Sequence, residues 1–123
     1  MSRISHFEIP AKDPEKVAAF YRAVFDWEIS KWDGPIDYWN VRTGPDDVQG
    51  INGGLFTPEG PLPHQTINTI EVDDIDGFVA KVKANGGNVV SDKVAIPQMG
   101  WIAYCKDVEG TVFGIYQGDP NAA

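Results

Sequence analysis

Cysteine and long apolar runs are almost absent from this chain. Cys105 is the only cysteine among 123 residues, which excludes a disulfide framework and makes the cytoplasm the expected location. No apolar stretch approaches the roughly 20 residues that a membrane helix needs. The opening MSRISHFEIP also lacks the apolar segment of a signal peptide. We therefore expect no membrane association, and we interpret Cys105 as a small buried hydrophobe in a strand.

Positive charge is scarce as well. Ten Lys and Arg stand against 18 Asp and Glu, which gives a formal net charge of −8. Such a chain would repel a phosphate backbone, so nucleic acid is not an expected partner. An acidic surface favours cationic ligands instead. The hydrophobic content of 42% and the length are those of one globular domain.

The order of predicted elements occurs twice. Alternation in ISHFEI predicts a strand over 4–9, and Asp13-Pro14 predicts a helix start. The first set continues with strands at 27–32, 37–43 and 50–56. The second set has a strand over 67–72, a helix capped by Asp73 or Asp74 and ended by Gly86-Gly87, and strands at 88–94, 101–105 and 111–117. We predict an α+β fold of one domain, 1–123, with module one at about 4–56, a proline-rich connector at 57–65, module two at about 66–117 and a frayed tail.

Three segments carry a family resemblance that covers about Ile4 to Gln117: HFEIPAKDPEKVAAFYRAVFDW, EVDDIDGFVAKVKANGG and KDVEGTVFGIYQ. With its two βαβββ modules, the chain resembles the vicinal oxygen chelate superfamily of glyoxalases, bleomycin-resistance proteins and extradiol dioxygenases. The resemblance implies that the modules pair into a curved, barrel-like sheet with helices outside and a concave cup inside. It also implies a small-molecule ligand, and a homodimer is common among relatives of this length.

Metal-using members of this superfamily place one ligand on the first and one on the last strand of each module. In this chain the first position falls on His6. Its counterpart in module two is Ile67 or Thr69, depending on the alignment, and the last strands offer Gly114 and Asn52. Only His6 suits a metal, and three or more protein ligands are needed. We therefore expect the usual metal site to be missing and predict no cofactor, with a divalent metal held by His6, Glu8 and Glu71 as the alternative.

Strand alternation assigns further residues to the cup. Phe7 and Ile9 are expected to pack under the first helix, whereas His6 and Glu8 point the other way. His6 is either a ligand contact or a polar residue hydrogen-bonded within the sheet. Glycines in INGG indicate close approach by a ligand, the other module or a second subunit. The candidate catalytic residues are His6, Glu8 and Glu71, and the candidate ligand-binding residues are His6, Trp39, Asn52, Thr69, Met99, Trp101 and Tyr116.

Two functions follow from these residues, and a third alternative, a subunit or regulatory module whose cup is occupied by a partner, stays open. The first is a small-molecule-binding protein of the glyoxalase and bleomycin-resistance type, whose tryptophans favour a flat or cationic ligand. The second is a metal-dependent, glyoxalase-like lyase or isomerase with non-standard ligands, or a dioxygenase relative. The sequence leaves open whether the chain is an enzyme.

Overall fold

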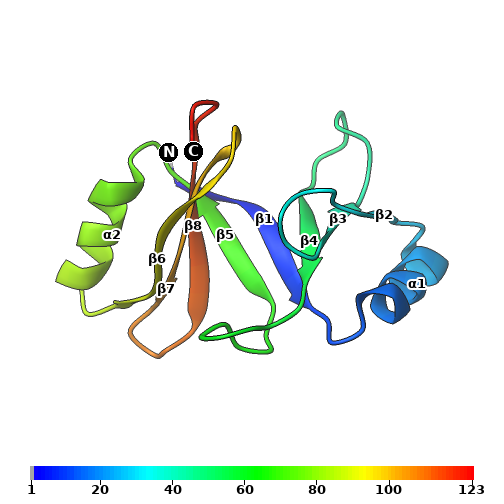
Figure 1. Ribbon diagram of the computed structural model, residues 1–123, viewed down its shortest axis with the longest axis horizontal. Coiled ribbons are helices and arrows are strands. Elements are labelled where there is room, and N and C mark those ends of the chain that lie inside the picture. The colour runs from blue at the N-terminus through cyan, green and yellow to red at the C-terminus, as the bar shows by residue number, and fades with distance from the viewer. Residues whose placement is uncertain (1) are drawn as a thin grey trace. The chain divides into compact units, whose positions relative to one another are not determined.

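The computed structural model describes residues 2–123 and divides into two compact units. One unit is His6–Thr66, and the other joins residues 2–5 to Ile67–Ala123. Each unit contains one helix and at least four strands in the βαβββ order, drawn in Figure 1. The predicted α+β fold with a repeated module is therefore confirmed. No helix among residues 2–123 is long and apolar enough to span a bilayer.

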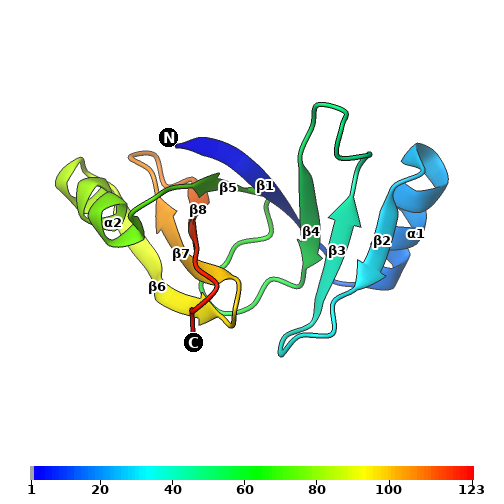
Figure 2. The same ribbon diagram turned by 90° about the horizontal axis from the view of Figure 1, so that it is seen from above.

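Module one is a mixed sheet covered on one side by a helix. Its elements are β1 (Arg3–Pro10), α1 (Pro14–Phe25), β2 (Glu28–Lys31), β3 (Tyr38–Arg42) and β4 (Asn52–Phe56), in sheet order β2-β3-β4-β1. β1 runs parallel to β4, and the other pairs are antiparallel. The core between sheet and helix is formed by Ala18, Ile29, Trp39, Val41 and Leu55. Figure 2 shows α1 alongside β2.

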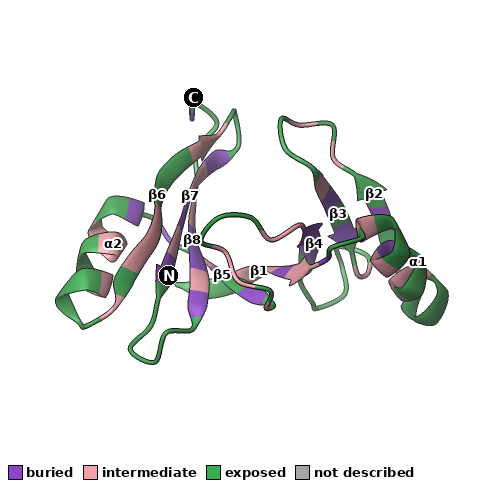
Figure 3. Cartoon of the chain, turned by 60° about the horizontal axis from the view of Figure 1, so that its bottom comes forward, coloured by how far each residue is buried: buried purple, intermediate pink, exposed green. Residues whose placement is uncertain are grey.

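Module two repeats this arrangement. Its elements are β5 (Ile67–Glu71), α2 (Ile75–Ala84), β6 (Asn88–Ile96), β7 (Gly100–Lys106) and β8 (Val112–Gly118), in sheet order β5-β8-β7-β6. Here β5 is parallel to β8. The core under α2 contains Val72, Ile75, Ala103, Cys105 and Ile115. Figure 3 shows this burial on the strands, while the outer sides of both helices are exposed. Cys105 is fully buried, as predicted.

Side-chain caps fix where the helices begin. Asp13 accepts a hydrogen bond from the Lys16 backbone N–H, with Pro14 in the first helical position, as the sequence predicts. In module two the capping residue is Asp74, which accepts from the Gly77 N–H. The choice between Asp73 and Asp74 is thus settled by the structure.

The predicted frayed tail is wrong. Ala122 is 3% exposed, and its carbonyl accepts a hydrogen bond from the Gln98 N–H at 2.9 Å. The Asp119 N–H donates to the Met99 carbonyl at 2.9 Å. The tail is therefore hydrogen-bonded to the turn between β6 and β7, a pairing between distant segments that composition alone does not reveal.

Candidate functional site

Module one presents a polar sheet face on the side away from α1. The strand registers place His6 opposite Asn52, Glu8 opposite Gly54, and Gly54 opposite Asn40. Opposed residues on neighbouring strands point to the same side of a sheet. We call this surface the polar face of module one; its residues are His6, Glu8, Ser30, Tyr38, Asn40, Asn52 and Gly54. Phe7 and Ile9 pack on the other side, under α1, as predicted.

A hydrogen bond between His6 and Tyr38 lies on this face. The Nε2 atom of His6 and the Oη atom of Tyr38 are 2.7 Å apart. Trp32 packs edge-on against Tyr38, with the ring centroids 6.2 Å apart. Burial lowers the pKa of His6 below its ordinary value of 6.5, and the nearby charge of Glu8 opposes this shift. In its neutral form an imidazole can donate or accept a hydrogen bond, or accept a proton.

The three candidate catalytic residues do not all belong to one module. Glu8 is 7% exposed and lies two residues from His6 on the same side of β1. These two residues are thus brought together on the polar face of module one. Glu71 is at the end of β5, in module two, and is exposed. Of the proposed catalytic set, module one supplies an imidazole and a carboxylate.

Asn52 is engaged by its own module. Its Oδ1 atom accepts a hydrogen bond from the Thr43 backbone N–H at 2.9 Å. The Thr43 hydroxyl also donates to the Ile51 carbonyl at 2.7 Å. The Asn52 side chain therefore holds the segment between β3 and β4, although it stands opposite His6.

Module two places Thr69 and Tyr116 on the side of its sheet away from α2. Thr69 stands opposite Gly114, and Glu71 opposite Tyr116. Thr69 is 3% exposed, and its Oγ1 atom has no hydrogen-bond partner among the residues that the structure describes. Tyr116 donates from Oη to the carbonyl of Met99 at 2.8 Å. Burial, and secondarily the charge of Glu71, raises the pKa of the Tyr116 phenol.

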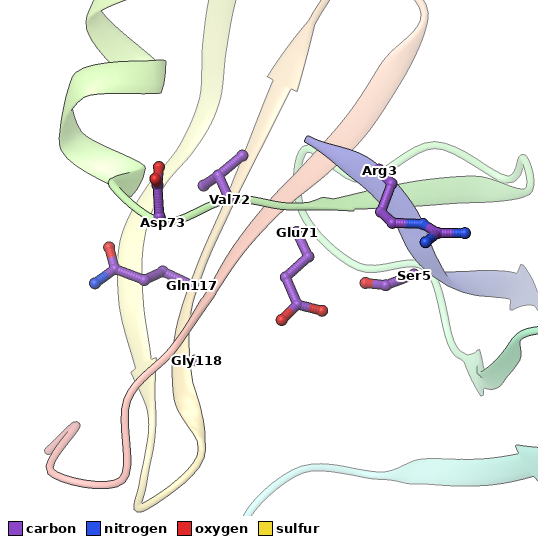
Figure 4. Close-up of a pocket in the computed structure, with 7 residues that line it drawn as sticks. All are labelled: Arg3, Ser5, Glu71, Val72, Asp73, Gln117 and Gly118. Carbon is purple, nitrogen blue, oxygen red and sulfur yellow. The ribbon is translucent and has the colours of Figure 1, made fainter. Parts of the chain in front are cut away.

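A polar hollow of about 560 Å³ lies in the same unit (Figure 4). Glu71 and Ser5 extend into it beside Arg3, and Asp73 and Gln117 lie at its other end. The Oε1 atom of Gln117 accepts a hydrogen bond from the Ile75 N–H at 2.9 Å. The hollow thus offers a guanidinium and two carboxylates to a polar small molecule.

The two candidate tryptophans lie elsewhere. Trp39 is 7% exposed in the core under α1, and its Nε1 donates to Glu15 at 2.6 Å. Trp101 packs against the core under α2, and its Nε1 donates to Asp119 at 3.0 Å. Both indoles are on the helix-facing sides of their sheets, opposite to His6 and Thr69 within the respective modules. We therefore exclude them from the candidate site.

The residues at the four expected metal positions do not fit a divalent ion. The registers pair His6 with Asn52 and Thr69 with Gly114, which favours Thr69 over Ile67 as the counterpart of His6. The Nε2 atom of His6 is hydrogen-bonded to the Tyr38 hydroxyl, and the Oδ1 atom of Asn52 accepts a hydrogen bond from the Thr43 N–H. Gly114 has no side chain to offer. Within residues 2–123, no three His, Cys, Asp or Glu side chains are grouped closely enough to hold an ion.

Tyr38, an aromatic residue of the predicted strand at 37–43, is absent from the ligand-binding set predicted from the sequence. Its strand reads Tyr-Trp-Asn-Val-Arg, in which Trp39 and Val41 are buried and the other three residues are not. Once the apolar positions of this strand are assigned to the core, alternation places Tyr38 on the opposite side. The alternation of apolar residues in this strand therefore indicates the side on which Tyr38 lies. The interpretation of Trp39 as a ligand contact is incompatible with that pattern.

Comparison with known proteins identifies relatives of this sequence. A Mycobacterium bovis protein with the name "Putative glyoxylase CFP32" is 29% identical over 117 residues. The match covers 93% of this chain and 43% of that protein. The chain therefore spans less than half the length of this relative.

Solved structures share the fold over almost the whole chain. A hypothetical protein from Bacillus halodurans C-125 superposes with a TM-score of 0.73 at 14% identity, covering 99% of this chain and 98% of the other. A variant of Streptomyces coelicolor methylmalonyl-CoA epimerase, in complex with 2-nitronate-propionyl-CoA, gives a TM-score of 0.71 at 16% identity, covering 98% and 97%. The family profile described as Glyoxalase/Bleomycin resistance protein/Dioxygenase superfamily matches residues 3–115. Because this match includes nearly all of both modules, the chain belongs to the glyoxalase/bleomycin-resistance/dioxygenase superfamily.

Proposed function

We propose that this protein binds a small molecule through the polar face of module one, without the divalent metal that the superfamily resemblance implies. The observation that carries the proposal is the hydrogen bond of 2.7 Å between His6 and Tyr38. It presents two polar aromatic side chains together on a sheet face that also holds a buried carboxylate, Glu8. A few polar groups fixed in orientation are what a small-molecule site requires.

The donor set supports binding without a metal. An ion at Nε2 of His6 would have to displace the Tyr38 phenol, and the opposed Asn52 oxygen already accepts from Thr43. One imidazole alone holds a divalent ion weakly. In module two, the equivalent pair of Thr69 and Gly114 supplies at most a hydroxyl.

The ligand is expected to be recognised by hydrogen bonds. The tryptophan argument for a flat or cationic ligand loses its support, because Trp39 and Trp101 pack under the helices. Tyr38 lies on the polar face with Trp32 in edge contact with it, and Phe56 stands opposite Tyr38 on the same side of the sheet. We still expect the protein to be a homodimer and to be located in the cytoplasm. Light scattering of the purified protein checks whether it is a dimer.

A thermal-shift screen of metabolites, CoA esters and metals tests this proposal. A ligand should raise the melting temperature in a concentration-dependent way. The shift should be lost in His6→Gln and kept in Trp101→Phe, because only His6 is on the polar face. Equal shifts in both variants would contradict the assignment.

Metal analysis separates the alternative function. Protein purified without added metal and dialysed should hold far less than one equivalent of zinc, nickel or iron. A near-stoichiometric metal that survives dialysis would overturn the metal-free proposal and favour a glyoxalase-like lyase or isomerase. In that case, loss of the metal in His6→Gln would place it on this face.

A further inference from the structure

Module one has an open cavity of its own, which lies against α1 and outside the polar face. It has a volume of about 620 Å³ and is formed by the end of β1, the segment that leads into α1, one side of α1, and His64. This volume is in the range of known small-molecule pockets. None of its lining residues was selected as a ligand contact from the sequence.

One wall of this cavity is apolar and aromatic. Phe20 and Tyr21 come three and four residues after Val17, so both lie on the same side of α1 as Val17. Phe20 is 58% exposed, although it packs edge-on against Tyr21 with centroids 5.2 Å apart. The Tyr21 ring in turn stacks on Trp27 at 5.0 Å. The Phe20 ring is therefore held in place by Tyr21 and Trp27 behind it, and its outer side remains open to solvent.

The rim of the cavity is basic. Lys12 and Lys16 both line it, and neither forms an ion pair within the part of the chain that the structure describes. The one acidic residue in the lining is Asp13, whose carboxylate accepts a hydrogen bond from the Lys16 backbone N–H at 3.3 Å. The lining thus holds two lysines and one aspartate, in a protein whose formal net charge is −8.

We propose that this cavity binds a small organic anion with an apolar body, such as a medium-chain carboxylate. The anionic head would lie between Lys12 and Lys16, and the apolar body would cover Phe20 and Tyr21. Charge complementarity selects the head, because an excess of positive charge is local to this rim. Burial of the exposed Phe20 ring supplies the apolar part of the binding free energy.

Competition between a fluorescent anion and two ten-carbon ligands tests the proposal. The probe is 8-anilinonaphthalene-1-sulfonate, an aromatic sulfonate, titrated into the full-length chain. Decanoate should displace it, and decanol, with the same chain but no charge, should do so at least about fivefold more weakly, as two exposed charge contacts predict. Equal displacement by both would overturn the role of the lysines.

Substitutions locate the binding site. The double variant Lys12→Gln/Lys16→Gln should raise the Kd for decanoate about five- to tenfold, whereas Lys83→Gln/Lys106→Gln on module two should leave it unchanged. Phe20→Ser should weaken binding, and Val108→Ser, which changes a residue that is 76% exposed, should not. His6→Gln should retain decanoate binding, which distinguishes this cavity from the polar face. Unchanged affinity for decanoate in both the lysine variant and Phe20→Ser would refute the proposal. A fluorescence change that arises only from self-association of the protein through Phe20 would also refute it.

Discussion

The phenol of Tyr38 reaches the imidazole of His6 by crossing over Gly54. The hydrogen bond measures 2.7 Å, and a Cβ atom at Gly54 would collide with the Tyr38 ring and hydroxyl. The neighbouring Gly53 is different, because a Cβ there would collide with the backbone carbonyl of Phe7. The two glycines therefore mark close approach by groups of module one itself, one by a side chain and one by main chain.

Gly54→Ala should cost less stability than Gly53→Ala. At Gly54 the obstacle is the far end of a side chain, so Tyr38 can move at the expense of its hydrogen bond to His6, about 1 kcal/mol. At Gly53 the obstacle is main chain, and overpacking of this kind costs about 1–3 kcal/mol. Urea denaturation of both variants measures the difference. Tyr38→Phe is the control, because it removes the hydroxyl alone and should match Gly54→Ala.

His6 should make stability depend on pH below about 6.5. Its pKa in the folded protein is lowered by burial, so the unfolded chain binds the proton more readily than the folded one. The free energy of unfolding is therefore fully retained above the unfolded pKa of about 6.5 and falls as the pH drops toward the lower, folded pKa. Melting temperatures measured from pH 5 to 8 should decline more steeply in wild type than in His6→Gln. Parallel curves would show that His6 titrates alike in both states.

Sequence patterns predicted the elements because the signals are local. Asp13-Pro14 specifies a capped helix start, and alternation within one strand separated Phe7 and Ile9 from His6 and Glu8. Both results need only residues a few positions apart. The repeated order of these local signals then predicted two βαβββ modules.

Alternation separates the two sides of a single strand, but it does not say which of these sides lies on the same side of the sheet as a given side of another strand. Whether Trp39 shares a side with His6 depends on the registers of β1 with β4 and of β4 with β3, and a shift of one residue reverses every side chain. The same uncertainty applied to Trp101. The tail contact of Ala122 and the hydrogen bond between His6 and Tyr38 also join segments far apart in sequence, for which no periodicity gives a signal.

Thr69→Val should stabilise the protein. The Oγ1 atom of Thr69 is buried without a hydrogen-bond partner in the described residues, and a buried unsatisfied hydroxyl costs about 1–3 kcal/mol. Valine has nearly the same shape and high strand propensity, so chemical denaturation should show a gain of about 1 kcal/mol. A loss of stability would mean that the hydroxyl has a partner in solution.

Removal of residues 119–123 should loosen the turn between β6 and β7. The Asp119 carboxylate accepts a hydrogen bond from the Trp101 indole N–H at 3.0 Å. The Asp119 N–H donates to the Met99 carbonyl, and the Ala122 carbonyl accepts from the Gln98 N–H. Loss of these bonds and of the buried Ala122 should lower the free energy of unfolding by about 1–3 kcal/mol. Amide hydrogen exchange should rise at Gln98, while exchange in β3 and β4 stays unchanged. Asp119→Asn tests the contribution of the carboxylate alone. The hydrogen bond from Trp101 lowers the pKa of Asp119. The stabilising effect of this carboxylate should therefore be present at neutral pH and disappear as the pH falls below about 4. If truncation left exchange at Gln98 unaltered, the tail would not hold this turn in solution.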